Sequence, residues 1–173
     1  DLGEAIILDS DDKNALIMLG DVYFKEKRYN EAITIYQSLL NIYPEDILFN
    51  TQLADAFYKL KFPQEAIIAY QNILNLYSED INSMIQLGNI FFESNDYDNA
   101  IYYYNKVIDC NDQEKEALYN IALSYAYKDS PLQALIAFKR VSMIDPNDKI
   151  IKYQIGVMYV ELEIYDKAIS YFV

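Results

Sequence analysis

Residues 81–114 read INSMIQLGNIFFESNDYDNAIYYYNKVIDCNDQE, and their pattern recurs along the chain at an interval of 34 residues. Gly88 has small counterparts at each interval: Gly20, Ala54, Ala122 and Gly156. A second small column is Ala32, Ala66, Ala100, Ala134 and Ala168. Large residues keep the same register in three columns: Leu19, Leu53, Leu87, Ile121, Ile155; Tyr23, Phe57, Phe91, Tyr125, Tyr159; Tyr36, Tyr70, Tyr104, Phe138, Phe172. Because no insertion or deletion interrupts the interval, the sequence predicts a repeat protein.

Each repeat carries two stretches of helical apolar spacing with a polar break between them, as in Leu16, Leu19, Tyr23 and then Ile33, Tyr36. Pro63 and Pro131 stand where the second helix begins, a position at which a missing amide hydrogen costs little. With only four Gly and four Pro in 173 residues, few tight turns are available. The pattern therefore predicts an all-α protein with two helices in each repeat, in which small residues allow close helix contact.

The pattern Leu16, Leu19, Gly20, Tyr23, Ala32, Tyr36, Pro44 resembles the tetratricopeptide repeat consensus over the whole chain. The resemblance implies a right-handed α-solenoid of antiparallel helix pairs. It also implies that the first helix of each pair lines a concave groove. We expect those first helices near residues 13–26, 47–60, 81–94, 115–128 and 149–162.

The register divides the chain into one array over residues 1–173. Residues 1–12 are predicted to be the tail of a preceding repeat, and 149–173 a truncated fifth repeat, after full repeats at 13–46, 47–80, 81–114 and 115–148. A solenoid normally needs polar terminal elements. We therefore expect the chain to be a piece of a longer protein and to self-associate through its cut ends.

Composition excludes several classes of function. The chain has 14 Lys and Arg against 27 Asp and Glu, a net charge of -13, which is the wrong sign for a nucleic-acid partner. No apolar run reaches the roughly 20 residues that span a bilayer, so we expect no membrane insertion in this region. A single cysteine fits a reducing compartment, and a cytoplasmic location is predicted.

The sequence favours a binding protein over an enzyme. It contains no histidine, which removes the usual general base at neutral pH and imidazole metal ligands. Cys110 shares a repeat position with Leu8, Ile42, Leu76 and Ile144, so it is predicted to be a core residue and not a nucleophile. The acidic residues between repeats are explained as loop residues and helix caps. We expect no catalytic residues, no metal and no cofactor.

Four side-chain amides recur two residues before the small column: Gln52, Gln86, Asn120 and Gln154. An amide carries both a donor and an acceptor, so it can pair with the backbone of an extended peptide. The arrangement is similar to the asparagine ladder in the tetratricopeptide superhelix of protein O-linked N-acetylglucosamine transferases. The alternative is that these amides are ordinary surface residues.

Apolar and aromatic residues flank the amides. Tyr58, Tyr119, Tyr127 and Tyr153 lie opposite the packing stripe of the first helices, on the face that lines the groove in the family. Ile85 and Phe92 belong to the two columns beside the amides. The predicted site is therefore a groove that binds a peptide through both backbone and side chains.

A second use of this family is a clamp for the C-terminal tails of chaperones, which needs Lys and Arg converging with Asn on a carboxylate. Asn89 and Asn120 match the two asparagines of that clamp. The basic places hold Ile85, Ile150 and Gln154, so chaperone-tail binding is not expected.

The leading functional hypothesis is a protein–protein interaction scaffold that holds an extended peptide or a partner helix in the concave groove. One alternative is a self-assembling scaffold that uses the convex face or the open ends. Another is the substrate-binding arm of an enzyme whose catalytic domain lies outside these residues. A partner could also be held by the basic turns, which carry Lys25, Lys27, Arg28, Lys59 and Lys61.

Overall fold

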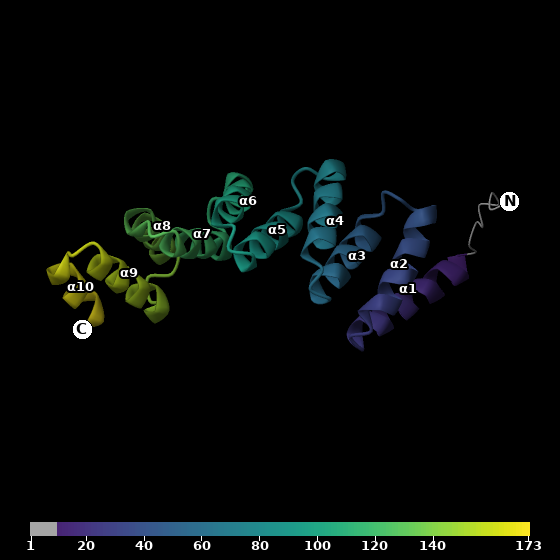
Figure 1. The fold of residues 1–173 in the computed structure, drawn as a ribbon, viewed down its shortest axis with the longest axis horizontal. Coiled ribbons are helices and arrows are strands. Elements are labelled where there is room, and N and C mark those ends of the chain that lie inside the picture. The colour runs from purple at the N-terminus through teal and green to yellow at the C-terminus, as the bar shows by residue number, and fades with distance from the viewer. Residues whose placement is uncertain (1–9) are drawn as a thin grey trace. The chain divides into compact units, whose positions relative to one another are not determined.

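A computed structural model describes residues 10–173, and their side chains from residue 13 onward. This part of the chain contains ten α-helices and no β-strand (Figure 1). The first helices of the pairs are α1 (Ser10–Lys25), α3 (Ile47–Lys59), α5 (Ile81–Glu93), α7 (Lys115–Tyr127) and α9 (Lys149–Glu161). The second helices are α2 (Tyr29–Ile42), α4 (Pro63–Leu76), α6 (Tyr97–Cys110), α8 (Pro131–Ile144) and α10 (Tyr165–Phe172).

Helices α3, α5, α7 and α9 have the bounds expected from the sequence to within one residue. The first helix is different, because α1 begins at Ser10 and not near residue 13. No proline or glycine interrupts residues 10–12, so the helix continues through them. The tail of a preceding repeat was predicted over residues 1–12. Residues 10–12 belong instead to α1, and residues 1–9 lie outside the described part of the chain.

The turn inside each helix pair has one backbone geometry throughout. Lys27, Lys61, Asn95, Asp129 and Glu163 all have positive φ, between 50° and 62°. The amide of the following residue closes the turn: the Arg28 amide, for example, donates to the Tyr23 carbonyl oxygen at 2.8 Å. Glycine normally occupies this left-handed position. Its absence from all five turns is why the sequence marked them only as polar breaks.

Close packing of the two helices in a pair explains the first small column. A Cβ atom added at Gly88 would lie 2.4 Å from Cε1 of Tyr104, and one at Gly156 would lie 2.5 Å from Cε1 of Phe172. The same contact at Gly20 is with Tyr36, at 2.9 Å. The second small column is equally tight, because Ala32, Ala66, Ala100 and Ala134 are all 0% exposed. The aromatic ring of one helix therefore fills the space that the small residue of the other leaves open.

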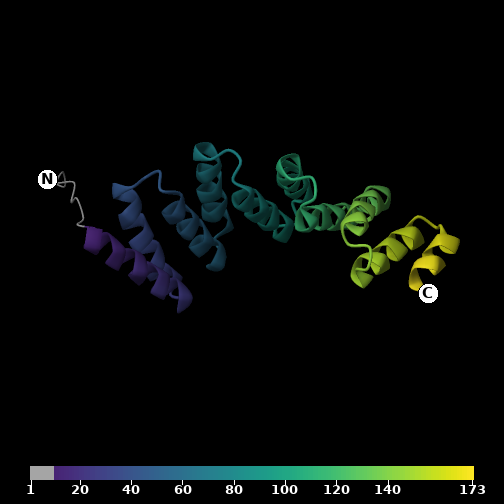
Figure 2. The same cartoon turned by 180° about the vertical axis from the view of Figure 1, so that it is seen from behind.

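The chain divides into two compact units, one ending at Ser83 and the other running from Met84 to Val173. In the first unit α2 packs against α1 and α3, and α3 packs against α4. In the second unit α7 packs against α6 and α8, and α9 packs against α8 and α10. Within each unit these helices therefore pack on their neighbours in sequence, and Figure 2 shows the same helix pairs from behind.

Cys110 is exposed, so the prediction that it is a core residue is wrong. Two other members of its column, Leu76 and Ile144, are 43% and 38% exposed. All three lie at or near the last turn of a second helix, beyond the buried residues Ile73, Val107 and Val141. The apolar column therefore continues past the end of the packed surface.

Candidate interaction surface

The residues of the predicted groove lie on helices α3, α5, α7 and α9. We call this side of the helices the first-helix face. The four amides Gln52, Gln86, Asn120 and Gln154 are all half-buried there. Ile85, Asn89, Phe92, Tyr58 and Tyr119 are half-buried as well, whereas Tyr127 and Tyr153 are 63% and 58% exposed. Gln52 and Tyr58 belong to the first unit, and the other residues belong to the second.

The amides differ in how far the protein itself engages them. Asn120 donates a hydrogen bond from Nδ2 to Oδ1 of Asn89 at 3.4 Å, and the hydroxyl of Tyr104 donates to the same oxygen at 2.6 Å. The side-chain amides of Gln86 and Gln154 form no hydrogen bond with any described residue. These two amides therefore keep both donor and acceptor for a ligand, whereas Asn120 is already part of an internal network.

The bond from Tyr104 to Asn89 belongs to a series of hydrogen bonds that was not among the predictions from the sequence. Tyr36 donates to Asp21 at 3.0 Å and Tyr70 donates to Asp55 at 2.5 Å, in each case 15 residues back along the chain. In the last two repeats Phe replaces Tyr at 138 and 172, and Leu123 and Val157 replace the acceptors. The signal was present in the sequence, because the hydroxyl and its acceptor are lost together.

Burial shifts the pKa values of Asp55 and Tyr70, which form one of these hydrogen bonds. Burial raises the pKa of Asp55 above its usual value, although the hydrogen bond from Tyr70 and the nearby charge of Lys59 act in the opposite direction. The pKa of Tyr70 is raised mainly by burial and further by the Asp55 carboxylate. In the first unit, this face therefore presents carboxylates at the position where the later repeats carry Asn, Leu and Val.

Three aromatic rings form a cluster at one edge of the first-helix face in the second unit. The rings of Tyr97 and Tyr127 are stacked with centroids 5.6 Å apart, and Phe92 meets both edge-on, at 5.5 Å and 5.6 Å. The ion pair of Lys128 with Asp98 joins the residue that follows α7 to α6. Packing therefore holds the exposed ring of Tyr127 in place. Because the ring is already ordered, it would lose less side-chain entropy when a partner binds.

A cavity of about 480 Å³ lies at the beginning of α7 and α9. Tyr119 and Ile150 line it, together with Glu114, Lys115, Glu116, Asp148 and Ile151. The ring of Tyr119 is supported edge-on by Phe138, with centroids 5.9 Å apart. Ile150 is 63% exposed. The cavity therefore combines an anchored aromatic ring with accessible aliphatic surface.

Two of the residues that line this cavity, Lys115 and Asp148, belong to a group of ion pairs. The Lys115 ammonium lies 2.8 Å from Oδ2 of Asp145 and 3.0 Å from Oδ2 of Asp148. These hydrogen bonds raise the pKa of Lys115, and the hydrogen bond from Lys115 lowers the pKa of Asp148. Asp148 also accepts hydrogen bonds from the amides of Ile150 and Ile151 at the start of α9. The start of α7 is thereby fastened to the start of α9.

Tyr58 has a different environment in the first unit. The ammonium groups of Lys61 and Lys59 lie 5.3 Å and 5.7 Å from its ring centroid. This geometry is typical of cation–π contacts. The basic turn predicted from the sequence thus lies against a tyrosine of the predicted groove.

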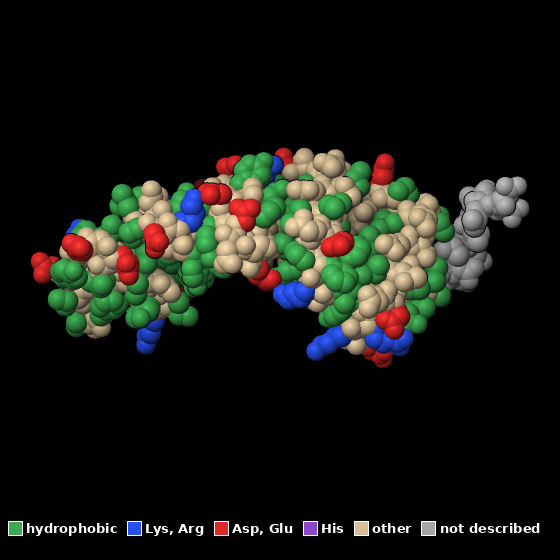
Figure 3. Space-filling model, in the orientation of Figure 1, with side chains coloured by type: hydrophobic (Ala, Val, Ile, Leu, Met, Phe, Trp, Pro, Cys, Tyr) green, Lys and Arg blue, Asp and Glu red, His purple; other side chains and the backbone are tan. Residues whose placement is uncertain are grey.

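The surface of the described residues is mixed in character. Figure 3 shows hydrophobic side chains exposed over both units, with acidic side chains scattered among them. Among the side chains that the structure describes, residues 13–173, no group of three or more Cys, Asp or Glu is arranged to hold a metal ion. Over the same residues no helix has both the length and the apolar character needed to cross a bilayer.

The comparisons with known proteins agree with this architecture, which is that of an all-α helical-repeat solenoid. Residues 2–73 match a family model described as anaphase-promoting complex, cyclosome, subunit 3, and residues 51–115 match one described as tetratricopeptide repeat. The matched residues belong to the tetratricopeptide repeat family. No curated protein matches it.

Solved structures of similar fold cover most of the chain. A crystal structure of the MamA protein has a TM-score of 0.83 at 21% identity, covering 92% of this chain and 87% of that one. A MamA fragment from Desulfovibrio magneticus RS-1 has a TM-score of 0.82 at 16% identity, with 92% and 90% covered. YrrB, described as a TPR protein with an unusual peptide-binding site, has a TM-score of 0.73 at 19% identity, with 94% and 88% covered. At these identities the likeness shows the fold.

Proposed function

We propose that this chain is a protein-interaction scaffold that binds an extended peptide on the first-helix face. The observation that carries the proposal is the cavity of about 480 Å³ at the start of α7 and α9, lined by Tyr119 and Ile150. A rigidly supported aromatic ring beside exposed aliphatic surface is typical of an anchor site for a partner side chain. The description of YrrB as a peptide-binding protein of the same fold also supports it.

The amides of Gln86 and Gln154 recognise the backbone of the peptide in this proposal. Both are half-buried and have no hydrogen bond to another described residue. Each can accept from a peptide N–H and donate to a peptide carbonyl, whatever side chains the peptide carries. Side-chain preference then comes from the cavity at Tyr119 and from the aromatic cluster of Phe92, Tyr97 and Tyr127.

The test begins with peptides selected from a random-peptide display library on the unmodified protein. Their affinities are then measured for Gln86→Ala and Gln154→Ala, with Gln133→Ala, an exposed amide on α8, as the matched control. Each groove substitution should weaken binding by about 0.5–1.5 kcal/mol, the net value of one neutral hydrogen bond, or roughly two- to tenfold. Tyr119→Ala should weaken it more, because it also removes aromatic contact area.

Failure to select any peptide would contradict the proposal, and so would affinities that are unchanged in a combined Gln86→Ala, Gln154→Ala and Tyr119→Ala variant. A strong loss of affinity with added salt, together with unchanged affinity in that variant, would move the site to the basic turns.

A second candidate function is self-assembly through the second helices. Ile68, Tyr102 and Ile136 occupy the same repeat position on α4, α6 and α8, and they are 58%, 52% and 56% exposed. Sedimentation velocity over a range of protein concentrations distinguishes this candidate. Association that is lost in an Ile136→Lys variant would support it.

A further inference from the structure

The fourth repeat lacks an aromatic contact that other repeats contain. Phe24 packs edge-on against Tyr29, with ring centroids 5.2 Å apart, and Phe92 packs in the same way against Tyr97, at 5.5 Å. The corresponding residues of the fourth repeat are Ala126 and Pro131. Both rings are therefore missing from the turn between α7 and α8.

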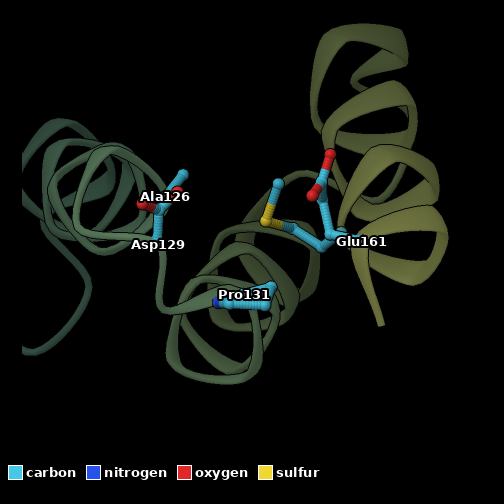
Figure 4. Close-up of a pocket in the computed structure, with 5 residues that line it drawn as sticks. Ala126, Asp129, Pro131 and Glu161 are labelled. Atoms are coloured by element: carbon cyan, nitrogen blue, oxygen red, sulfur yellow. The ribbon is translucent and has the colours of Figure 1, made fainter. Parts of the chain in front are cut away.

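A cavity of about 320 Å³ occupies this region. Ala126, Asp129 and Pro131 line it from the end of α7 and the beginning of α8, and Met158 and Glu161 line it from α9. Figure 4 shows Ala126 and Asp129 on one side, Glu161 on the opposite side, and Pro131 between them. Met158 is only 6% exposed, so the cavity combines a buried apolar side chain with an acidic rim formed by Asp129 and Glu161.

The rim carries two carboxylates with no cation of their own. Asp129 and Glu161 are exposed and form no ion pair with any described residue. None of the five lining residues is basic. The adjacent Lys128 is paired with Asp98 on α6. A neutral apolar occupant would remove water from these carboxylates and offer them no hydrogen bond or positive charge in return. The lost hydration would make its binding unfavourable.

We propose that this cavity receives an Arg or Lys side chain of the bound peptide. The inference rests on the proposed function, since it assumes that a peptide binds the first-helix face to which Ala126 belongs. The aliphatic stem of the cation would contact Ala126, Pro131 and Met158, as long basic side chains commonly pack on apolar surface. Its charged head would form charge-assisted hydrogen bonds with Asp129 and Glu161. The net charge of -13 favours a basic partner as well.

Two variants test the site in different ways. Ala126→Phe restores the ring found in the first three repeats and fills the cavity. The double substitution Asp129→Asn with Glu161→Gln keeps the shape and removes the charge. Glu65→Gln, an exposed carboxylate in the first turn of α4, is the control for charge alone. Circular dichroism melting curves check that each variant is folded.

Peptides are selected from the random-peptide display library on the unmodified protein, and each selected peptide is also made with its Arg and Lys residues replaced by norleucine. Selected sequences should be enriched in Arg or Lys, and the replacement should weaken binding to the unmodified protein at least about tenfold. In the charge variant, which carries Asp129→Asn with Glu161→Gln, replacing Arg and Lys of the peptide by norleucine should change the affinity little. The Glu65→Gln protein should behave like the unmodified protein. Ala126→Phe should also lose the preference for the basic peptide.

The outcomes separate this inference from the proposed function. Selected peptides without Arg or Lys enrichment, or a replacement effect that persists in the charge variant, would overturn the inference while leaving the peptide-binding function in place. If the library yields no peptide at all, the proposed function itself fails.

Discussion

The hydrogen bonds from Tyr36, Tyr70 and Tyr104 place a polar acceptor on the first-helix face in each of the first three repeats. The acceptor is Asp21, Asp55 or Asn89, at distances of 2.5 to 3.0 Å. Since an amide serves in the third repeat, a negative charge is not required for this bond. The carboxylate of Asp55 is therefore expected to cost stability when it is ionised, because burial is the largest influence on its pKa.

Replacing Asp55 by Asn should raise the free energy of unfolding at pH 7. The pKa of Asp55 in the folded protein lies above the ordinary value of 3.8, so folding favours the neutral form. The stability that this carboxyl contributes is fully present below its unfolded pKa and is lost as the pH rises through its raised folded pKa. The advantage of Asp55→Asn should therefore shrink as the pH falls toward 3.8 and below.

Urea unfolding at pH 7 and at low pH measures this difference. An Asp55→Asn variant that is less stable than the unmodified protein at pH 7 would show that the charged hydrogen bond from Tyr70 outweighs burial.

The helices of this chain begin in two different ways, with a side-chain cap or with proline in the first turn. Asp46 and Asp148 cap α3 and α9 by accepting from two backbone amides each, and their side chains satisfy donors that the helix leaves open. The second helices α4 and α8 instead begin with proline at the first turn and have no side-chain cap. The stability of α3 and of α9 should therefore depend on its own capping aspartate.

Asp46→Ala should lower the free energy of unfolding by about 0.5–2 kcal/mol, the usual value of an N-cap. The bonds lost are those to the amides of Leu48 at 3.0 Å and Phe49 at 3.4 Å. Glu45→Ala is the matched control, because it removes the neighbouring carboxylate and leaves the cap in place. Chemical denaturation of both variants measures the difference, and equal stability of the two would mean that the cap contributes nothing.

Stability in the molecule as a whole is expected to be distributed along the chain, because within each compact unit the helices pack on their sequence neighbours. We propose that the repeats at 13–46, 47–80, 81–114, 115–148 and 149–173 form one array. Unfolding can then begin in one repeat while a distant repeat keeps its structure. This behaviour is not expected of a domain with a single central core.

Ala100→Leu tests both the packing and its range. Ala100 is 0% exposed, so a larger side chain should overpack the contact between α5 and α6 and cost about 1–3 kcal/mol. Hydrogen exchange should show lost protection in α5, α6 and α7, with protection in α1 and α2 largely retained. An unchanged denaturation midpoint would show that the second small column is not a close contact. Equal loss in every helix would show that the chain unfolds as one unit.

The sequence determined the helical architecture, because every repeat carries small and large apolar residues at the same positions and these residues must pack against one another. Gly88 and Tyr104 are one example. A small residue recurs every 34 residues in the column of Gly88, an aromatic ring recurs at the same interval in the column of Tyr104, and the two residues are in contact in the structure. Periodicity also located the amides and tyrosines of the candidate face, since helical spacing alone separates them from the buried stripe. The left-handed turns were recognised only as breaks, because none of them uses glycine.

The tertiary structure decided which of these side chains are available to a partner. Gln86 and Asn120 stand in the same sequence column, yet only Asn120 is engaged by a neighbour, Asn89, which lies 31 residues away. Ala126 is a second example, because nothing in the sequence distinguishes it from other small residues. It lines a cavity only because Met158 and Glu161 of α9 line the same cavity. Repeat spacing specifies which face a residue occupies, whereas hydrogen-bond partners and cavities depend on distances between helices that the spacing does not contain.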